Sequence, residues 1–160
     1  MSNHITRLHI GLFGRRNTGK SSVINRLTDQ NLSIVSDIPG TTTDPVKKAV
    51  EIPGLGPVVL IDTAGIDDIG ELGTQRVNKT RQAIQQVDMA IVVLCNNSFN
   101  KAEQQLIEQL QQLQIPFILL HNKSDEHPAD DSVIAELTER YQVDFLDFSY
   151  ASIWSFLLSR

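Results

Sequence analysis

The sequence predicts one α/β domain, in which about six mostly parallel strands form a sheet with helices on both faces. Short apolar runs alternate with amphipathic segments along the chain, which is typical of a parallel sheet covered by helices. The 160 residues suffice for one hydrophobic core and are too few for two domains. We therefore assign residues 1–160 to a single domain. The last segment, 153–160, would form only a short helix, so we expect this domain to belong to a longer protein.

Six apolar runs have the length and composition of strands: residues 8–13, 47–52, 58–62, 89–95, 117–122 and 144–148. The link between the second and third runs, Pro-Gly-Leu-Gly-Pro, is rich in turn residues. These two strands should therefore form an antiparallel hairpin. Four amphipathic segments predict helices: residues 20–28, 73–87, 101–113 and 132–141. Ser132 is the candidate N-cap of the last one.

The overall charge and the cysteine content argue against several kinds of function. A net charge of -5 argues against a nucleic-acid-binding surface, which is usually basic. No apolar run approaches the roughly 20 residues that span a bilayer, and the N-terminus lacks a signal-peptide layout. We expect a cytoplasmic protein without a membrane partner. Cys95 is the single cysteine, so this chain should hold no iron–sulfur cluster, which needs about four ligands. We expect its thiol to be buried.

The strongest motif is GRRNTGKS at residues 14–21, which matches GxxxxGKS between a predicted strand and a predicted helix. Glycines let the backbone wrap around phosphates, and the N–H groups of the loop and of the helix N-terminus face the negative charge. Lys20 should reach the β- and γ-phosphates, and the Ser21 hydroxyl should bind Mg²⁺. The predicted nucleotide-binding residues here are Asn17, Thr18, Gly19, Lys20, Ser21 and Ser22.

The second motif is DTAG at residues 62–65, at the end of an apolar strand. The Asp62 carboxylate there can hold Mg²⁺ through water. The Gly65 N–H can bond the γ-phosphate, so that loss of this phosphate frees the loop that follows.

The third motif, NKSD at residues 122–125, predicts the base. The Asp125 carboxylate can accept two hydrogen bonds from guanine, whereas adenine offers no such pair of donors. Buried polar groups left unpaired make this discrimination large. Asn122 can tie this segment to the phosphate loop, and the Lys123 stem can lie over the base. The three motifs together predict GTP and GDP as ligands, with Mg²⁺.

Two further segments complete the predicted site. Residues 36–44, SDIPGTTTD, read as a loop between a helix and a strand, and one threonine should bind Mg²⁺. Thr42 is the first choice and Thr41 the second. After the last strand, a backbone N–H of Ser149 or Ala151 should contact the guanine carbonyl.

In this order, GxxNxGKS, PGTTTDP, DTAG and NKSD resemble the TrmE–Era–EngA group of P-loop GTPases, which implies a three-layer Ras-like fold. Longer strings resemble the FeFe-hydrogenase maturation GTPase family, HydF: GRRNTGKSSVINRLT, SIVSDIPGTTTDPVKKAVEI, GPVVLIDTAGIDDIGELG and RVNKTRQAI. The resemblance runs from about residue 10 to about residue 125.

The HydF resemblance implies a scaffold or carrier that helps to assemble the di-iron subcluster of the hydrogenase active site. Its implied partners are two radical-SAM maturases and the hydrogenase. Members of that family also have a dimerisation domain and an iron–sulfur cluster domain, which we do not expect within these 160 residues. We therefore expect a homodimer for the full-length protein and a monomer for the isolated domain.

The predicted catalysis is slow GTP hydrolysis that relies on Lys20, Thr42 and Gly65. Many GTPases place a water-orienting glutamine where this chain has Ile66, so each turnover should take on the order of minutes or longer. We expect the Arg15 and Arg16 side chains to point to solvent, and the residue that positions the water stays open.

Resemblance to potassium-stimulated members of the TrmE-like group also implies a K⁺ site. Its ligands would be Asn17 and the carbonyls of Ser36 and Ile38, and the ion would offset developing charge.

Two other functions fit the same motifs. One is an RNA- or ribosome-associated or tRNA-modification GTPase of the TrmE/Era type. The other is an interaction module that is gated by the bound nucleotide and hydrolyses it incidentally.

Overall fold

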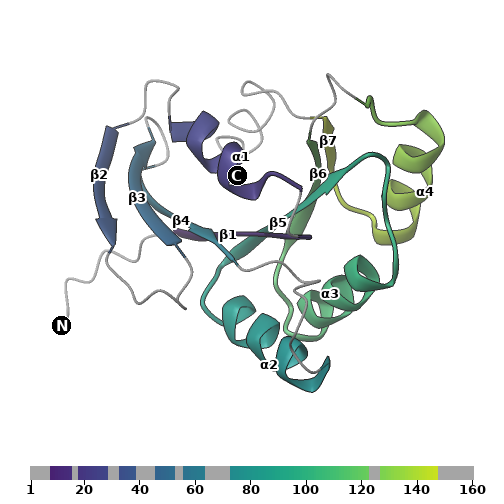
Figure 1. The fold of residues 1–160 in the computed structure, drawn as a ribbon, viewed down its shortest axis with the longest axis horizontal. Coiled ribbons are helices and arrows are strands. Elements are labelled where there is room, and N and C mark those ends of the chain that lie inside the picture. Colours follow the sequence, from purple (N-terminus) through teal and green to yellow (C-terminus); the bar gives the residue numbers. More distant parts are fainter. Residues whose placement is uncertain are drawn as a thin grey trace.

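The computed structural model describes residues 8–15, 18–28, 33–38, 46–52, 56–63, 73–122 and 127–147. Within them a seven-stranded sheet has the order β2-β3-β4-β1-β5-β6-β7, and helices cover both faces (Figure 1). The strands are β1 (Leu8–Gly14), β2 (Ser33–Ile38), β3 (Val46–Ile52), β4 (Gly56–Asp62), β5 (Met89–Cys95), β6 (Phe117–Asn122) and β7 (Phe145–Asp147). The helices are α1 (Lys20–Thr28), α2 (Gly73–Ile84), α3 (Lys101–Gln112) and α4 (Asp131–Tyr141). This architecture confirms the predicted fold class.

Two hydrophobic cores lie on opposite faces of the sheet. Successive side chains of a strand point to opposite faces, so Ile91 and Val93 of β5 belong to one core and Val92 to the other. Helix α1 covers the first core with Val23 and Ile24. Helices α2, α3 and α4 contribute to the second core (Figure 1). The central strands are therefore buried on both sides, as their apolar sequences require.

The strand directions bring several chain segments to one edge of the sheet. Strands β4, β1, β5, β6 and β7 are parallel neighbours. Strands β3 and β4 form the predicted antiparallel hairpin, with Val50 opposite Val58. Gly14, Asp62, Cys95 and Asn122 end four adjacent parallel strands, so the segments that follow them leave the sheet at the same edge.

Strand β2 was not predicted. We expected residues from Ser36 onward to lie in a loop, but residues 33–38 pair antiparallel with β3. Its sequence, SIVSDI, is too polar to read as a buried strand. It lies at the edge of the sheet, where only one side pairs with a neighbour, and its register shifts between Ile34 and Ser36.

Several boundaries also differ from the predictions. Helix α2 ends at Ile84 rather than at residue 87, although Val87 is buried. Helix α4 starts one residue earlier than expected, with Asp130 rather than Ser132 in the N-cap position. Cys95 is half-buried rather than buried, because it is the last residue of its strand, β5. None of the described helices has the length and apolar character needed to cross a membrane.

Candidate nucleotide-binding site

The predicted motifs begin at the carboxyl ends of three parallel strands. The GxxxxGKS loop leaves β1, the DTAG motif begins at the end of β4, and the NKSD motif begins at the end of β6. In open α/β sheets, ligands bind in the crevice outside this edge. Strand order alone therefore collects three distant parts of the sequence into one candidate site.

Glycine is required at two positions of the phosphate loop. A Cβ on Gly14 would lie 2.6 Å from the Val93 carbonyl oxygen, so the loop passes too close to β5 for any side chain. Gly19 has φ +84°, in the left-handed region that side chains disfavour. Its carbonyl then accepts the Val23 N–H at 2.9 Å, in the first turn of α1. The loop thus leads directly into a helix N-terminus, which favours anions.

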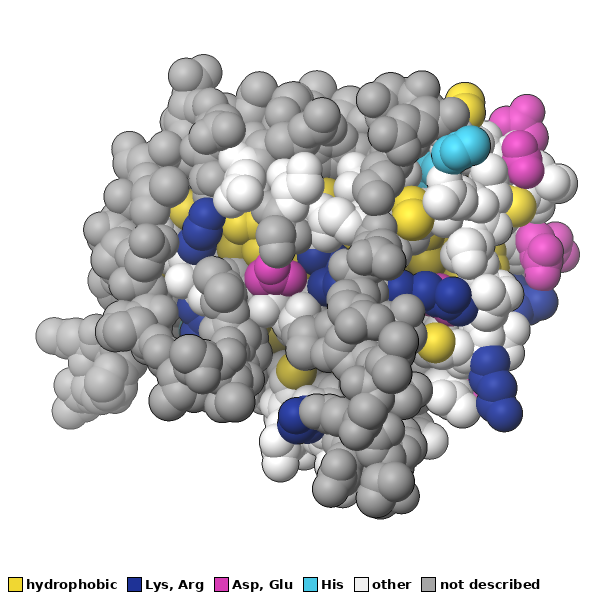
Figure 2. Space-filling view, in the orientation of Figure 1, with side chains coloured by type: hydrophobic (Ala, Val, Ile, Leu, Met, Phe, Trp, Pro, Cys, Tyr) yellow, Lys and Arg dark blue, Asp and Glu magenta, His cyan; other side chains and the backbone are white. Residues whose placement is uncertain are grey.

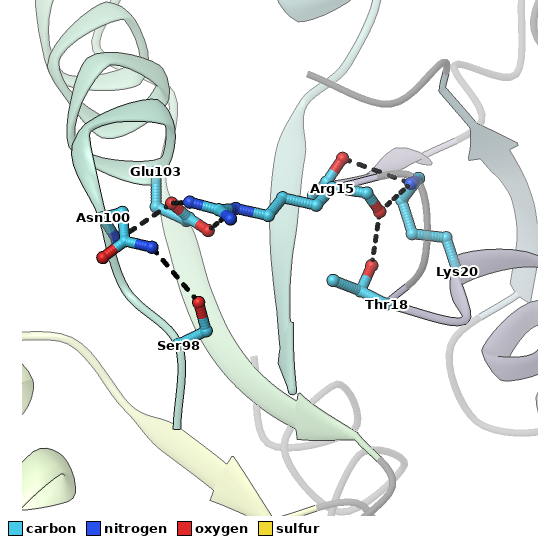
Figure 3. Close-up of polar contacts among 7 residues, drawn as sticks. Arg15, Thr18, Lys20, Ser98, Asn100 and Glu103 are labelled. Carbon is cyan, nitrogen blue, oxygen red and sulfur yellow. Dashed lines mark hydrogen bonds and ion pairs between the residues drawn. The ribbon is translucent and has the colours of Figure 1, made fainter. Parts of the chain in front are cut away.

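The backbone carbonyl of Arg15 is the centre of the described part of this loop (Figure 3). Lys20 Nζ donates to it at 2.8 Å and to the Gly14 carbonyl at 3.2 Å. The Thr18 hydroxyl and the Thr18 N–H also donate to it, at 2.9 and 3.2 Å. The Lys20 ammonium is therefore held against the backbone of the loop that carries the motif.

The Arg15 side chain does not point freely into solvent, so that expectation is wrong. Its Nε donates to Glu103 Oε1 at 2.6 Å and its Nη2 to Oε2 at 3.2 Å (Figure 3). The Glu103 side chain is 2% exposed. Glu103 Oε2 also accepts the Asn100 N–H at 3.0 Å, as in a capping box. Sequence reasoning missed Glu103, although the Asn-x-x-Glu pattern at the start of α3 was a signal.

The magnesium side of the site is described in part. Asp62 ends β4 opposite Leu12 of β1. The next residue, Thr63, is buried, and its hydroxyl donates to the Leu12 carbonyl at 2.7 Å. This bond fixes where the DTAG segment leaves the sheet. Ser21 is the second residue of α1. One hydroxyl, one carboxylate and the phosphates form the oxygen donor set that Mg²⁺ uses in proteins. Among the described residues, no group of three or more His, Cys, Asp or Glu side chains could hold a metal.

The base side of the site is tied to the phosphate loop. Asn122 Nδ2 donates to the Thr18 carbonyl at 2.8 Å, and both groups are buried. This is the contact that the sequence predicted between the two motifs. It joins segments that are 104 residues apart in sequence.

Asn97, which sequence reasoning missed, makes contacts on both sides of the NKSD segment. Asn97 follows β5, and its N–H donates to Nε2 of the fully buried His121 at 3.1 Å. Its side chain donates to the Pro128 carbonyl at 3.0 Å and accepts the Asp130 N–H at 2.7 Å. Asn97 thus contacts residues on both sides of residues 122–125. Its φ of +53° is a conformation that asparagine tolerates better than most residues.

Ser22 is the third residue of α1 and is exposed. The remaining predicted residues fall into two groups. Ser36 and Ile38 lie in β2, opposite Ala49 and Lys47 of β3, rather than in a loop. The others lie outside the described residues: Arg16, Asn17, Thr41, Thr42, Gly65, Ile66, Lys123, Asp125, Ser149 and Ala151.

The model of one protein family, described as 50S ribosome-binding GTPase, matches residues 9–123. The chain belongs to this family. It is 35% identical over 120 residues to the tRNA modification GTPase MnmE of Nitrosomonas europaea, covering 74% of this chain and 26% of that protein. MnmE of Prochlorococcus marinus strain MIT 9303 is 32% identical over 151 residues, covering 91% of this chain and 31% of that protein. The chain thus spans only about a quarter to a third of the length of these relatives.

Solved structures confirm the fold of this P-loop GTPase domain. Era in complex with MgGDPNP and nucleotides 1506–1542 of 16S ribosomal RNA superposes with a TM-score of 0.75 at 21% identity, covering 98% of this chain and 57% of that one. The G domain of the T. maritima FeoB iron transporter gives 0.64 at 20% identity, covering 92% and 90%. The chain is a GTP-binding GTPase domain of the TrmE/Era type. These findings match the alternative of a TrmE/Era-type GTPase better than the hydrogenase-maturation prediction.

Proposed function

We propose that this domain is a Mg²⁺-dependent GTP switch that hydrolyses GTP slowly. The observation that carries the proposal is the buried Asn122–Thr18 hydrogen bond, which joins the predicted base-selecting segment to the phosphate loop. Because the two segments are held together, one ligand with both a guanine and a phosphate chain fits both motifs.

Each motif then has one task. Lys20 offsets the charge of the β- and γ-phosphates, and Asp125 accepts the two guanine donors, with Lys123 over the base. Ser21 and Thr42 would hold the magnesium ion directly and Asp62 would hold it through water. The ion would supply charge neutralisation at the phosphates. The Gly65 N–H would donate a hydrogen bond to the γ-phosphate, and an N–H of Ser149 or Ala151 would donate one to the guanine carbonyl.

Calorimetry with magnesium tests this assignment. The full chain should bind GDP and GTP but not ADP or ATP, and Lys20→Ala should abolish measurable binding of GTP. Binding of ATP as tight as that of GTP would contradict the proposal. GTP hydrolysis, measured as the release of inorganic phosphate, should be slow because Ile66 cannot orient the attacking water molecule.

Potassium is the second part of the proposal. Asn17 supports it, as does the position of Ile38, which ends β2 opposite Lys47 at the edge where β4 ends in Asp62. Ser36 lies two residues farther back along the strand, roughly 7 Å away, so its carbonyl would need a local rearrangement to reach the same ion. Turnover in potassium chloride should exceed turnover in sodium chloride at equal ionic strength. Equal rates would remove the potassium site.

The cellular process has two candidates. The PGTTTDP and IDTAGIDD–GELG strings support hydrogenase maturation with radical-SAM partners, as part of a longer, homodimeric protein. The MnmE relatives support tRNA modification or another RNA-associated role. The family match and these relatives favour the second candidate. The net charge of -5 does not favour RNA binding by this domain itself. On the face in Figure 2, the Lys and Arg side chains of the described residues are interspersed with acidic and hydrophobic ones.

Two measurements separate these candidates. Binding of tRNA that weakens steeply with salt would indicate the RNA-associated role, because phosphate contacts release counterions. Loss of hydrogenase activation when Lys20→Ala is introduced into the full-length protein would indicate maturation. A nucleotide-gated interaction module would lose partner release when nucleotide exchange is blocked but not when hydrolysis alone is blocked.

A further inference from the structure

We propose that Glu103 is a positioning residue for phosphate binding, which acts through Arg15 on the loop that holds Lys20. The inference rests on the proposed function, because it concerns how that same site holds its phosphates. Glu103 lies on α3, far from the GxxxxGKS motif in sequence.

The first support is the geometry of the Arg15–Glu103 pair. Two hydrogen bonds, at 2.6 and 3.2 Å, join the guanidinium to the carboxylate. Such bidentate charge-assisted pairs are stronger and more directional than neutral hydrogen bonds. The Glu103 side chain is 2% exposed, whereas that of Arg15 is 29% exposed. A carboxylate so deeply buried is costly to leave without its partner, so the pair strongly restrains the Arg15 side chain.

The second support is what the Arg15 main chain does. Its carbonyl accepts bonds from Lys20 Nζ, from the Thr18 hydroxyl and from the Thr18 N–H. The Thr18 carbonyl in turn accepts the Asn122 side chain. A shift of Arg15 would therefore move the acceptor of the lysine that is predicted to reach the phosphates.

The third support is the rigidity of the element that carries Glu103. Helix α3 buries Leu106, Ile107 and Leu110 almost completely in the core shared with α2 and α4. Glu103 is also held at its own end, where it accepts the Asn100 N–H. The loop is thus anchored to a packed helix and not to another loop, and supporting residues on such elements hold a binding site precisely in place.

The pair also limits what Arg15 does in the reaction. Its guanidinium is engaged by Glu103 on the α3 side of the loop (Figure 3). Arg15 is therefore not an arginine that stabilises the transferred phosphate. A positioning role predicts weaker phosphate binding when the pair is broken, and not the loss of a catalytic charge.

The test compares Glu103→Gln with Glu108→Gln in the full chain. Glutamine at 103 can still accept the Asn100 N–H but loses the ionic pair. Glu108 is exposed on the same helix. Glu108→Gln is therefore the matched control, because it makes the same chemical change at a position away from the phosphate loop. Affinities for GDP and for GMP are measured with magnesium by calorimetry, and thermal unfolding is followed in parallel. GMP lacks the β-phosphate that Lys20 is predicted to reach.

Glu103→Gln should weaken GDP binding about tenfold, as for loss of one charged hydrogen bond, and should weaken GMP binding by less than about twofold. Glu108→Gln should change neither affinity. A GDP-to-GMP affinity ratio that stays at the wild-type value in Glu103→Gln would overturn the proposal, even if the melting temperature falls. If the wild-type chain itself fails to prefer GDP over ADP, the proposed function fails instead.

A second variant keeps the test decisive if Glu103→Gln does not fold. The double variant Arg15→Gln/Glu103→Gln leaves no unpaired buried charge and should show the same fall in the GDP-to-GMP ratio. An unchanged ratio in the double variant would equally overturn the proposal.

Discussion

At the scale of single residues, close backbone contacts decide which side chains the site tolerates. Gly14 passes β5 so closely that an added Cβ would lie 2.6 Å from the Val93 carbonyl oxygen and 3.0 Å from the Thr18 hydroxyl. Neither the oxygen nor the loop can move without disturbing a strand or the phosphate-binding backbone. Gly56 also has a positive φ, of +98°, but a Cβ there would meet nothing within 4 Å.

These two glycines give a matched prediction. Gly14→Ala should lower the free energy of unfolding by about 1–3 kcal/mol through overpacking and should reduce GDP affinity, because the loop must shift. Gly56→Ala should cost only about 1–2 kcal/mol of backbone strain and leave GDP affinity unchanged. Denaturant unfolding and calorimetry measure both effects. Equal GDP affinities for the two variants would show that the Gly14 contact does not shape the site.

At the scale of elements, the connection from β5 to α3 contacts both halves of the site. Its Asn97 contacts residues on both sides of the NKSD segment. Glu103, in the first turn of α3, holds Arg15 of the phosphate loop. The neighbouring Asn96 is exposed and has φ +55°, close to that of Asn97.

We expect Asn97→Ala to weaken the preference for GDP over inosine diphosphate several-fold, whereas Asn96→Ala should not. Both changes place alanine in the same left-handed conformation, so the backbone cost is shared. Only Asn97→Ala removes the side-chain bonds to Pro128 and Asp130, worth about 1 kcal/mol each. Competition binding with the two nucleotides measures the preference. Identical ratios of GDP affinity to inosine diphosphate affinity in the two variants would mean that the Asn97 side-chain bonds do not affect base recognition.

At the scale of the whole molecule, nucleotide binding links segments that the sheet carries on different strands. The Thr63–Leu12 and Asn122–Thr18 bonds already connect β4 and β6 to the β1 segment. A ligand that touches all three segments binds the folded chain and not the unfolded one, so it raises stability by mass action.

Magnesium with GDP at about 100 times its dissociation constant should add about 2.7 kcal/mol to the free energy of unfolding. For a domain of this size, that corresponds to a rise in melting temperature on the order of 5–10 °C. ADP at the same concentration should give no rise. Differential scanning fluorimetry checks this, and a rise with ADP equal to that with GDP would contradict guanine selection.

The fold class, the hairpin and the three nucleotide motifs were determined by the sequence alone. Buried strands, amphipathic helices and loop glycines follow local rules of periodicity and backbone geometry. The helix at residues 20–28 and the strand at residues 117–122 were therefore predicted with the bounds that the structure has. The link between Asn122 and the phosphate loop also followed from the order of the motifs.

Only the tertiary structure decided the partners of Arg15, the role of Asn97 and the existence of β2. Arg15 and Glu103 are 88 residues apart in sequence, and no local pattern shows which helix end will face which loop. Strand β2 is polar and pairs on one side, so its conformation depends on β3 and not on its own periodicity. Such contacts arise from how the sheet orders its strands, which is a property of the packed molecule.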